Sequence, residues 1–479
     1  MASPVERLVS SLSRGDIPWC HWKSNRHLDA ALRGRTDLDL LFPEDRRKDV
    51  ESALAEAGAR RFQPVSFRDY PGIEDYLAVD PSGPILVHFH VHFRLLVGER
   101  NIKAHSLPWE AEVLASRVPS APGSPIFVSS PEMELLLLIV RICVKQPRGA
   151  LRLDPDGGAA LELGWLRERV DGPAFSALAG RLLGADAAAA LRAVLDEGDR
   201  RIEGARPQVI TALAPHRRLS AAAEARLRRE RGWALRLTRR ARRAGLPVAA
   251  RRIRPRRGFA VALLGCDGSG KSSLTKAAAD FFAQKLDVER IYFGHGAGSR
   301  SALLRLALAA RRRFGRSASL RRLLDVPVAA AIDLDKVIGF VRLSLARRAG
   351  MLVVCDRFPQ AAVAGTCDGP RLPVLAAGNA LAGTLLRPFV PIERAIYRIG
   401  ERCAPDLVLK IRVSPAVAAA RKSDGTSLET ITRKVGVIDE LSFGEGVVVT
   451  EIQNEGIPFE EAARRVVAAI WNTMGDAAD

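Results

Sequence analysis

A short glycine-rich segment near the middle of the chain has the residues needed to bind phosphate. Gly265, Gly270, Lys271 and Ser272 fit the spacing G-x-x-x-x-G-K-[ST]. Glycines let backbone N–H groups surround phosphate oxygens, and the N-terminus of a following helix adds its positive dipole end. The lysine would neutralise the β and γ oxygens of a nucleoside triphosphate. A chance glycine turn is the alternative, and an apolar run before the segment and a helical pattern after it argue against that alternative.

This segment predicts ATP and Mg²⁺ as ligands, with the Ser272 hydroxyl on the metal. We expect ATP to contact Gly265, Asp267, Gly268, Ser269, Gly270, Lys271, Ser272 and Ser273. Such a loop identifies the donor of a phosphoryl group. It leaves the acceptor open.

Asp356 and Arg357 directly follow the apolar run MLVVC and form a second candidate site. At the end of a strand, the aspartate could hold Mg²⁺ through water or orient the attacking oxygen. The arginine could bind an acceptor phosphate through two parallel hydrogen bonds. An ordinary surface ion pair is the alternative.

Four basic residues lie further along the chain, at Arg421, Lys422, Arg433 and Lys434. The first two lie where a helical pattern gives way to a loop. Basic residues there could close over ATP and stabilise the transferring phosphoryl group. A solvated charged face is the equally open alternative.

The elements around these residues alternate between strand and helix from residue 258 onward. The apolar runs FAVALLG, MLVVCD and DLVLKIRV are continuous rather than alternating, which is typical of parallel strands covered on both faces. We therefore expect an α/β fold: a doubly wound parallel sheet over 258–479, with ligands at the carboxyl ends of the strands.

This half of the chain resembles the thymidylate kinase family of nucleoside monophosphate kinases. The resemblance rests on GCDGSGKSS, on the Asp-Arg-Phe at 356–358 and on PDLVLKIRVSPAVAAARK at 405–422, and it covers about residues 256–475. It implies that the Asp-Arg pair serves the acceptor phosphate and Mg²⁺, and that the basic segment forms a lid over ATP. These roles fall on Asp356, Arg357, Arg421 and Lys422, which join Lys271 in the predicted site.

Two departures from that family concern the acceptor. The family usually has Arg-Glu-Pro-Gly after its second strand, where this chain has YFGHGAGSR. The position that commonly holds a base-contacting arginine falls on Asp335, with Lys336 beside it. The resemblance therefore supports kinase activity in this chain more strongly than it supports thymidylate as the acceptor.

Asp37 and Asp39 form a second chemical signature near the N-terminus, in GRTDLDLL. Carboxylates at i and i+2 of a strand point to one side, so together they could hold Mg²⁺ for attack on a nucleoside triphosphate. This segment is similar to the nucleotidyltransferase superfamily over about residues 15–110, which predicts an α+β domain. Lys23 could contact a triphosphate there or be a surface lysine.

The strand expected at 85–96 carries His88, His90 and His92 on one face. In the similar nucleotidyltransferases, an Asp and a His stand where this chain has the last two histidines, so the third carboxylate is missing unless Glu74, Asp75 or Asp80 substitutes for it. Three alternate histidines span about 13 Å, too far to share one ion, although a pair with Asp37 or Asp39 could hold one. A degenerate pocket, an active nucleotidyltransferase and a mononuclear metal site all remain open.

Composition limits the class of protein. The 479 residues are 47% hydrophobic and 27% charged, which excludes wholesale disorder and a disulfide scaffold. No stretch reaches the ~18 apolar residues needed to cross a bilayer, and the N-terminus lacks the apolar core of a signal peptide. The six cysteines are scattered, which predicts reduced thiols rather than a zinc site and a cytoplasmic location.

We expect four segments: a nucleotidyltransferase-like domain at 1–125, a helical region at 126–215, an arginine-rich connector at 216–257 and the phosphate-binding domain at 258–479. Residues 217–257 hold 16 arginines and two acidic residues, a net +14 of the chain's +19. A solvated helical connector is the favoured interpretation, ahead of a partner such as nucleic acid or an anionic membrane surface.

The predicted function is ATP-dependent transfer of a phosphoryl group to a small-molecule acceptor, a nucleoside monophosphate or a related compound. The sequence leaves open whether the chain forms a homodimer. The alternative function is an ATP-switched binding or regulatory protein, with a degenerate N-terminal site and a connector that binds polyanions.

Overall fold

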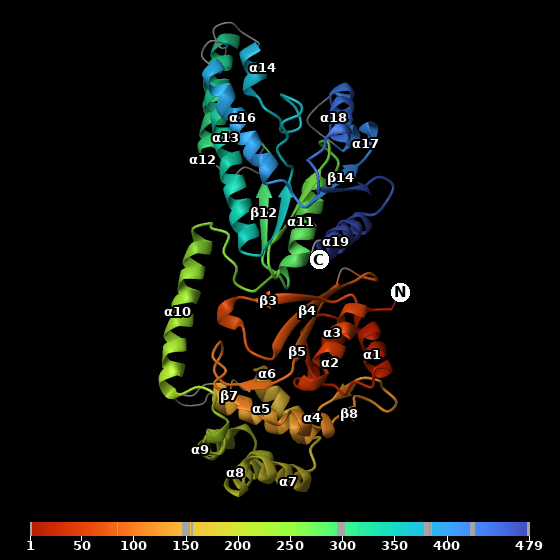
Figure 1. Ribbon diagram of the computed structural model, residues 1–479, viewed down its shortest axis with the longest axis vertical. Helices are drawn as coiled ribbons and strands as arrows, with labels where there is room; N and C mark the ends of the chain where they lie inside the picture. The colour runs from red at the N-terminus through yellow and green to blue at the C-terminus, as the bar shows by residue number, and fades with distance from the viewer. Residues whose placement is uncertain are drawn as a thin grey trace. The chain divides into compact units, whose positions relative to one another are not determined.

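The computed structural model describes residues 2–83, 85–145, 154, 157–294, 302–315, 317–377, 383, 386–421 and 427–476. The chain divides into two compact units, Met1–Arg240 and Ala241–Asp479 (Figure 1). The helical region expected at 126–215 and part of the expected connector fall in the first unit. No described helix combines the length and the apolar character that crossing a bilayer requires.

The first unit contains a mixed sheet with the strand order β3-β4-β5-β2-β1-β9-β8. Its strands are β1 (Cys20–His21), β2 (Leu38–Leu41), β3 (Arg60–Pro64), β4 (Ile73–Asp80), β5 (Ile85–His92), β8 (Val118–Pro119) and β9 (Phe127–Val128). A separate antiparallel pair joins β6 (Leu95–Val97) and β7 (His105–Leu107). Strands β2 and β5 are parallel neighbours, and their register places Asp39 opposite His90.

Helices surround this sheet and extend the unit. They are α1 (Pro4–Arg14), α2 (Leu28–Leu32), α3 (Arg47–Glu56), α4 (Glu110–Ala115), α5 (Pro131–Lys145), α6 (Gly158–Arg167), α7 (Gly172–Leu183), α8 (Ala185–Glu197), α9 (Ile202–Ala212) and α10 (Ala221–Arg243). Helix α5 is apolar around most of its circumference, and its residues from Met133 to Val140 are almost fully buried. It shares one hydrophobic core with Trp22 and with helices α6 to α9, so the helical region completes the core of this unit.

The second unit contains a five-stranded, fully parallel sheet with the order β12-β13-β11-β14-β15. Its strands are β11 (Phe259–Leu264), β12 (Val288–Tyr292), β13 (Leu352–Asp356), β14 (Leu407–Arg412) and β15 (Val448–Gln453), and a two-residue strand β10 (Arg252–Ile253) precedes them. Its helices are α11 (Lys271–Ala283), α12 (Ala302–Phe314), α13 (Ala318–Arg348), α14 (Leu372–Ala377), α16 (Val390–Arg402), α17 (Pro415–Ala420), α18 (Leu428–Glu440) and α19 (Phe459–Asp476).

Both faces of this parallel sheet are covered. On one face, Ala260 and Ala262 of β11 pack in a core with Phe340 and Leu343 of α13. The alternate residues of β11 are also fully buried, so the opposite face needs its own cover. Helix α11 packs against β11 and β13 there, and α19 packs against α11 (Figure 1). The α/β class expected from the continuous apolar strands is confirmed.

Candidate functional site

The glycine segment forms the connection between strand β11 and helix α11. Gly268 and Gly270 have φ values of +86° and +82°, in the left-handed region that favours glycine. A Cβ atom on Gly268 would lie 2.3 Å from the backbone oxygen of Ala418, and one on Gly265 would lie 2.4 Å from Ser269 Oγ. The loop therefore needs glycine at these positions for steric reasons.

The residues expected to contact ATP lie at this loop and in the first turn of α11. Lys271 is buried, and its Nζ donates a hydrogen bond to the backbone oxygen of Cys266 at 3.1 Å. Burial and the nearby Arg357 lower the pKa of Lys271. Ser272 and Ser273 are exposed at the helix N-terminus, where their hydroxyls are accessible to a ligand.

Three cationic side chains meet on one carboxylate of the loop, that of Asp267. Arg357 donates to Oδ1 and Lys434 donates to Oδ2, each at 2.7 Å, and Lys271 lies 3.5 Å from Oδ1. Burial alone would raise the pKa of Asp267, but the hydrogen bonds from Lys434 and Arg357 outweigh it and hold this pKa well below its usual range. The loop thus collects three positive charges next to the predicted phosphate position.

A pocket of about 310 Å³ adjoins the loop. Its walls include Gly265, Cys266, Asp267, Tyr292, Arg357, Asp368, Arg371 and Lys434. Three non-glycine wall residues, Arg357, Cys367 and Asp368, have positive φ values of 70°, 47° and 61°. Backbone strain of this kind often occurs where a binding site fixes the chain.

Asp356 is the last residue of β13, at the carboxyl end of the sheet. It is 7% exposed, and its Oδ1 accepts no hydrogen bond from the described residues. A buried carboxylate oxygen without a donor is costly unless water or a cation fills the position. The arrangement fits a Mg²⁺ ion held through water, together with the exposed Ser272 hydroxyl.

The basic residues downstream separate into two groups. Lys434 of α18 reaches Asp267, whereas Arg433 beside it is exposed. Arg421 is also exposed and donates to the backbone oxygen of Asn454 at 3.1 Å, while Lys422 lies outside the described residues. Of the three that the structure describes, Lys434 is the one with an ion pair to the glycine loop.

Asp335 and Lys336, the two residues at the expected acceptor position, both lie on α13 but differ in their surroundings. Neither residue lines the pocket directly: Asp335 is half-buried, and Lys336 is 1% exposed and donates a hydrogen bond to the Tyr397 hydroxyl. Tyr397 in turn donates to the backbone oxygen of Asp368, a pocket residue, at 2.9 Å. A helix turns by about 100° per residue, so Lys336 faces inward beside this site while its neighbour turns away. Residues 295–300, which belong to the first departure from the family, lie outside the described residues.

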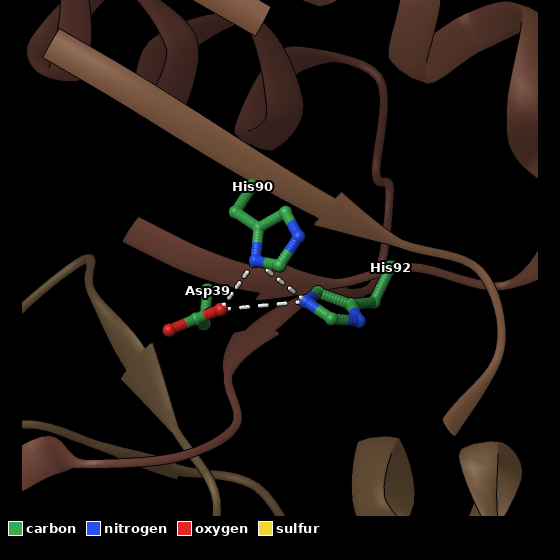
Figure 2. Close-up of side chains that lie close together, drawn as sticks. All are labelled: Asp39, His90 and His92. Atoms are coloured by element: carbon green, nitrogen blue, oxygen red, sulfur yellow. Dashed lines mark hydrogen bonds and ion pairs between the residues drawn. The ribbon is translucent and has the colours of Figure 1, made fainter. Parts of the chain in front are cut away.

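In the first unit, Asp39, His90 and His92 converge (Figure 2). His90 Nδ1 lies 2.7 Å and His92 Nε2 lies 3.3 Å from Asp39 Oδ1, and the two ring nitrogens are 3.1 Å apart. The parallel register of β2 and β5 places Asp39 opposite His90. The strands therefore bring together two of the three histidines.

The third histidine belongs to a different group. His88 Nδ1 lies 2.8 Å from Asp37 Oδ1, and its Nε2 lies 2.6 Å from Asp75 Oδ1. Two other acidic residues were candidates for the third carboxylate. Glu74 contacts Arg47 and Asp80 contacts Ser82, and neither of these contacts involves Asp39. Asp37 and Asp39 thus have separate histidine partners.

Several cations surround Asp39. Lys23 Nζ lies 2.8 Å from Asp39 Oδ1. Burial would raise the pKa of this carboxyl, but Lys23 and His90 outweigh it and hold the pKa low. Burial, together with Lys23 and Arg141, lowers the pKa of Lys103 to about 8. Burial and His90 lower the pKa of His92 well below its usual range.

Lys103→Met is expected to stabilise the first unit at neutral pH, by up to about 3 kcal/mol. The folded-state pKa of about 8 lies below the ordinary lysine pKa of 10.5, so the unfolded chain binds more protons between these values. The free energy of unfolding of the unmodified protein therefore rises with pH over that window, and the advantage of Met disappears near its upper end. Urea unfolding across this pH range measures the difference. The exposed Lys48→Met is the control, and an equal effect of both variants would contradict the prediction.

Some site residues lie outside the motifs found in the sequence. Asn454 follows β15 and donates from Nδ2 to the Ser269 backbone oxygen at 2.7 Å, and Tyr292 ends β12 at the pocket. Both stand at carboxyl ends of parallel strands, a signal that could have identified them. Lys103 gave no signal, because its proximity to Lys23 depends on the tertiary fold.

No protein-family model matches the chain. Among curated proteins, it is 27% identical over 223 residues to the "Uncharacterized ATP-binding protein YghR" of Escherichia coli K12, which covers 44% of this chain and 86% of that protein. It is 26% identical over 223 residues to the "Uncharacterized ATP-binding protein YghS" of the same strain, covering 44% of this chain and 91% of that protein. The chain is therefore similar to two proteins described as ATP-binding.

Proposed function

We propose that the second unit is an ATP-dependent phosphotransferase of the thymidylate kinase-like type. ATP binds at the loop from Gly265 to Ser272, and its γ-phosphoryl group passes to a phosphate or hydroxyl acceptor in the adjoining pocket. The similarity to two proteins described as ATP-binding supports the ATP-binding part of this proposal. The acceptor is a small molecule, with a nucleoside monophosphate as the first candidate.

The observation that carries the proposal is that the pocket and the glycine loop share residues. Gly265, Cys266 and Asp267 belong to both. A phosphoryl group held by the loop would therefore border the space available to a second ligand. This arrangement supports group transfer between two bound molecules, which depends mainly on positioning and charge stabilisation.

The residues at the loop have distinct roles in this proposal. Lys271 and the backbone N–H groups bind the β- and γ-phosphates, and Ser272 and Asp356 are suited to hold Mg²⁺, which when bound neutralises phosphate charge. Arg357 and Lys434 now bond to Asp267, and phosphate oxygens could take over these donors. Arg371 adds a further cation to the pocket wall, which favours an anionic acceptor.

ADP release tests the proposal. The purified full chain, with Mg²⁺ and ATP, is assayed across nucleoside monophosphates, deoxynucleosides and non-nucleotide phosphate esters, against an acceptor-free baseline. We expect at least one anionic acceptor to raise ADP release well above that baseline. Binding of ATP without stimulation by any acceptor would contradict group transfer and favour an ATP switch.

A second candidate function rests on helix α10. None of its 23 residues is buried, and the side chains of Arg229, Arg239, Arg240 and Arg243 form no ion pair or hydrogen bond with the described residues. By contrast, Arg228 binds Glu99 and Arg242 binds Asp287. The unpaired arginines support an ATP-switched protein that binds a polyanion.

Replacing these four unpaired arginines by Gln is expected to reduce polyanion binding under this alternative and to make it less salt-dependent. Fluorescence anisotropy with a labelled oligonucleotide at increasing ionic strength measures both quantities. The variant is expected to keep any acceptor-dependent ADP release. Oligonucleotide binding that is equal in the variant and the parent protein would remove support for the alternative.

A further inference from the structure

The Asp39, His90 and His92 group has the spacing of a metal coordination shell. Its three ligand atoms are separated by 2.7, 3.3 and 3.1 Å. Ligands about 2.1 Å from a metal ion lie about 3.0 Å apart at right angles and about 3.4 Å apart at tetrahedral angles. Figure 2 shows one oxygen and two ring nitrogens facing a common point. A single ion could contact all three with little movement of the side chains.

The surrounding structure fixes these ligands in place. Asp39 and His90 are opposite each other on the parallel strands β2 and β5. His92 is 3% exposed, and its ring packs edge-on against Trp22 at a centroid distance of 5.2 Å. Ligands carried on neighbouring strands and held by packing are already arranged for a metal, which reduces the entropy lost on binding.

The donor atoms select the class of metal. Imidazole nitrogens suit zinc and other first-row transition ions, whereas Mg²⁺ prefers a shell of oxygen ligands. Two imidazoles with one carboxylate leave further positions open for water or a ligand. We propose that Asp39, His90 and His92 bind one first-row transition-metal dication in the first unit, as an open centre separate from the Mg²⁺ site of the second unit.

Lys23 would compete with a metal ion for the carboxylate of Asp39. Its ammonium lies 2.8 Å from Asp39 Oδ1, the same oxygen that both histidines approach. A dication on this oxygen would repel Lys23 and displace it. Lys103 is near enough to interact electrostatically with both Lys23 and Arg141, so the surroundings of this centre are cationic. An oxygen anion such as phosphate is the ligand best suited to complete the coordination.

Cobalt binding tests this site without relying on any activity. The full chain is stripped with a chelator, placed in excess Mg²⁺ to fill oxygen-only sites, and titrated with Co²⁺ while visible absorption is recorded. We expect one equivalent of Co²⁺ with d–d bands, displaced by an equivalent of Zn²⁺. His90→Ala should weaken Co²⁺ binding at least about tenfold. The exposed His27→Ala is the matched control and should leave binding unchanged.

Lys23→Met provides a second variant that does not remove a ligand. Loss of the neighbouring positive charge should tighten Co²⁺ binding by about tenfold or more, because like charges a few ångströms apart repel strongly at a partly buried site. Inorganic phosphate should also tighten Co²⁺ binding in the unmodified protein. Absence of Co²⁺ binding in the unmodified chain, or equal binding in His90→Ala, would overturn the proposal.

Discussion

Lys271→Met is expected to lower kcat/KM for acceptor-dependent ADP release by about a thousandfold, the size of effect seen when a charge-stabilising donor is removed from a transition state. Lys271 lies at the N-terminus of α11, and its Nζ is held 3.1 Å from the backbone oxygen of Cys266. Methionine preserves most of the volume of the buried stem and removes the ammonium group with its contacts to Cys266 and Asp267. The variant should therefore lose charge stabilisation of the transferring phosphoryl group while the packing around residue 271 is kept.

Lys276→Met is the matched control for this variant. Lys276 belongs to the same helix but is exposed and pairs with Asp280 on the surface. It should keep full acceptor-dependent ADP release. Similar losses in both variants would mean that charge on α11, rather than the loop lysine, determines activity. An unchanged rate in Lys271→Met would contradict the assignment of the glycine loop as the ATP site.

The second unit was the more predictable part of the fold. Its strands are continuous apolar runs because both faces of the sheet are covered, and such runs stand out in the sequence between turns. The helix after the glycine loop was equally clear. The position of Lys434 against Asp267 was not, because the two residues are 167 positions apart and meet only after α18 packs beside the sheet.

The candidate site in the first unit was predictable in its residue types but not in its pairing. The alternation of His88, His90 and His92 placed all three on one face of a strand, and their span excluded a shared ion. The sequence left open which pair would meet which carboxylate. That choice depends on the register of β2 against β5, which places Asp39 opposite His90.

Asp267→Asn is expected to destabilise the ligand-free second unit by about 2 to 3 kcal/mol, because removing one partner leaves partly buried charges uncompensated. Arg357, Lys434 and Lys271 would lose the carboxylate that they share. The low folded-state pKa of Asp267 gives the sign of the pH effect. Its stabilisation is present above the unfolded-state pKa and is lost as the pH falls through the folded-state pKa, so near-neutral pH is the condition for the comparison.

ATP should partly rescue the same variant, since its phosphates supply negative charge to the three cations. The rise in melting temperature on adding MgATP is therefore expected to be larger in Asp267→Asn than in the unmodified protein. Differential scanning calorimetry with and without MgATP measures both effects. Asp280→Asn on the exposed face of α11 is the control and should change neither quantity. A variant that is equally destabilised but gains nothing extra from MgATP would show that Asp267 serves only the fold, because the cations that it holds would then not receive the phosphates.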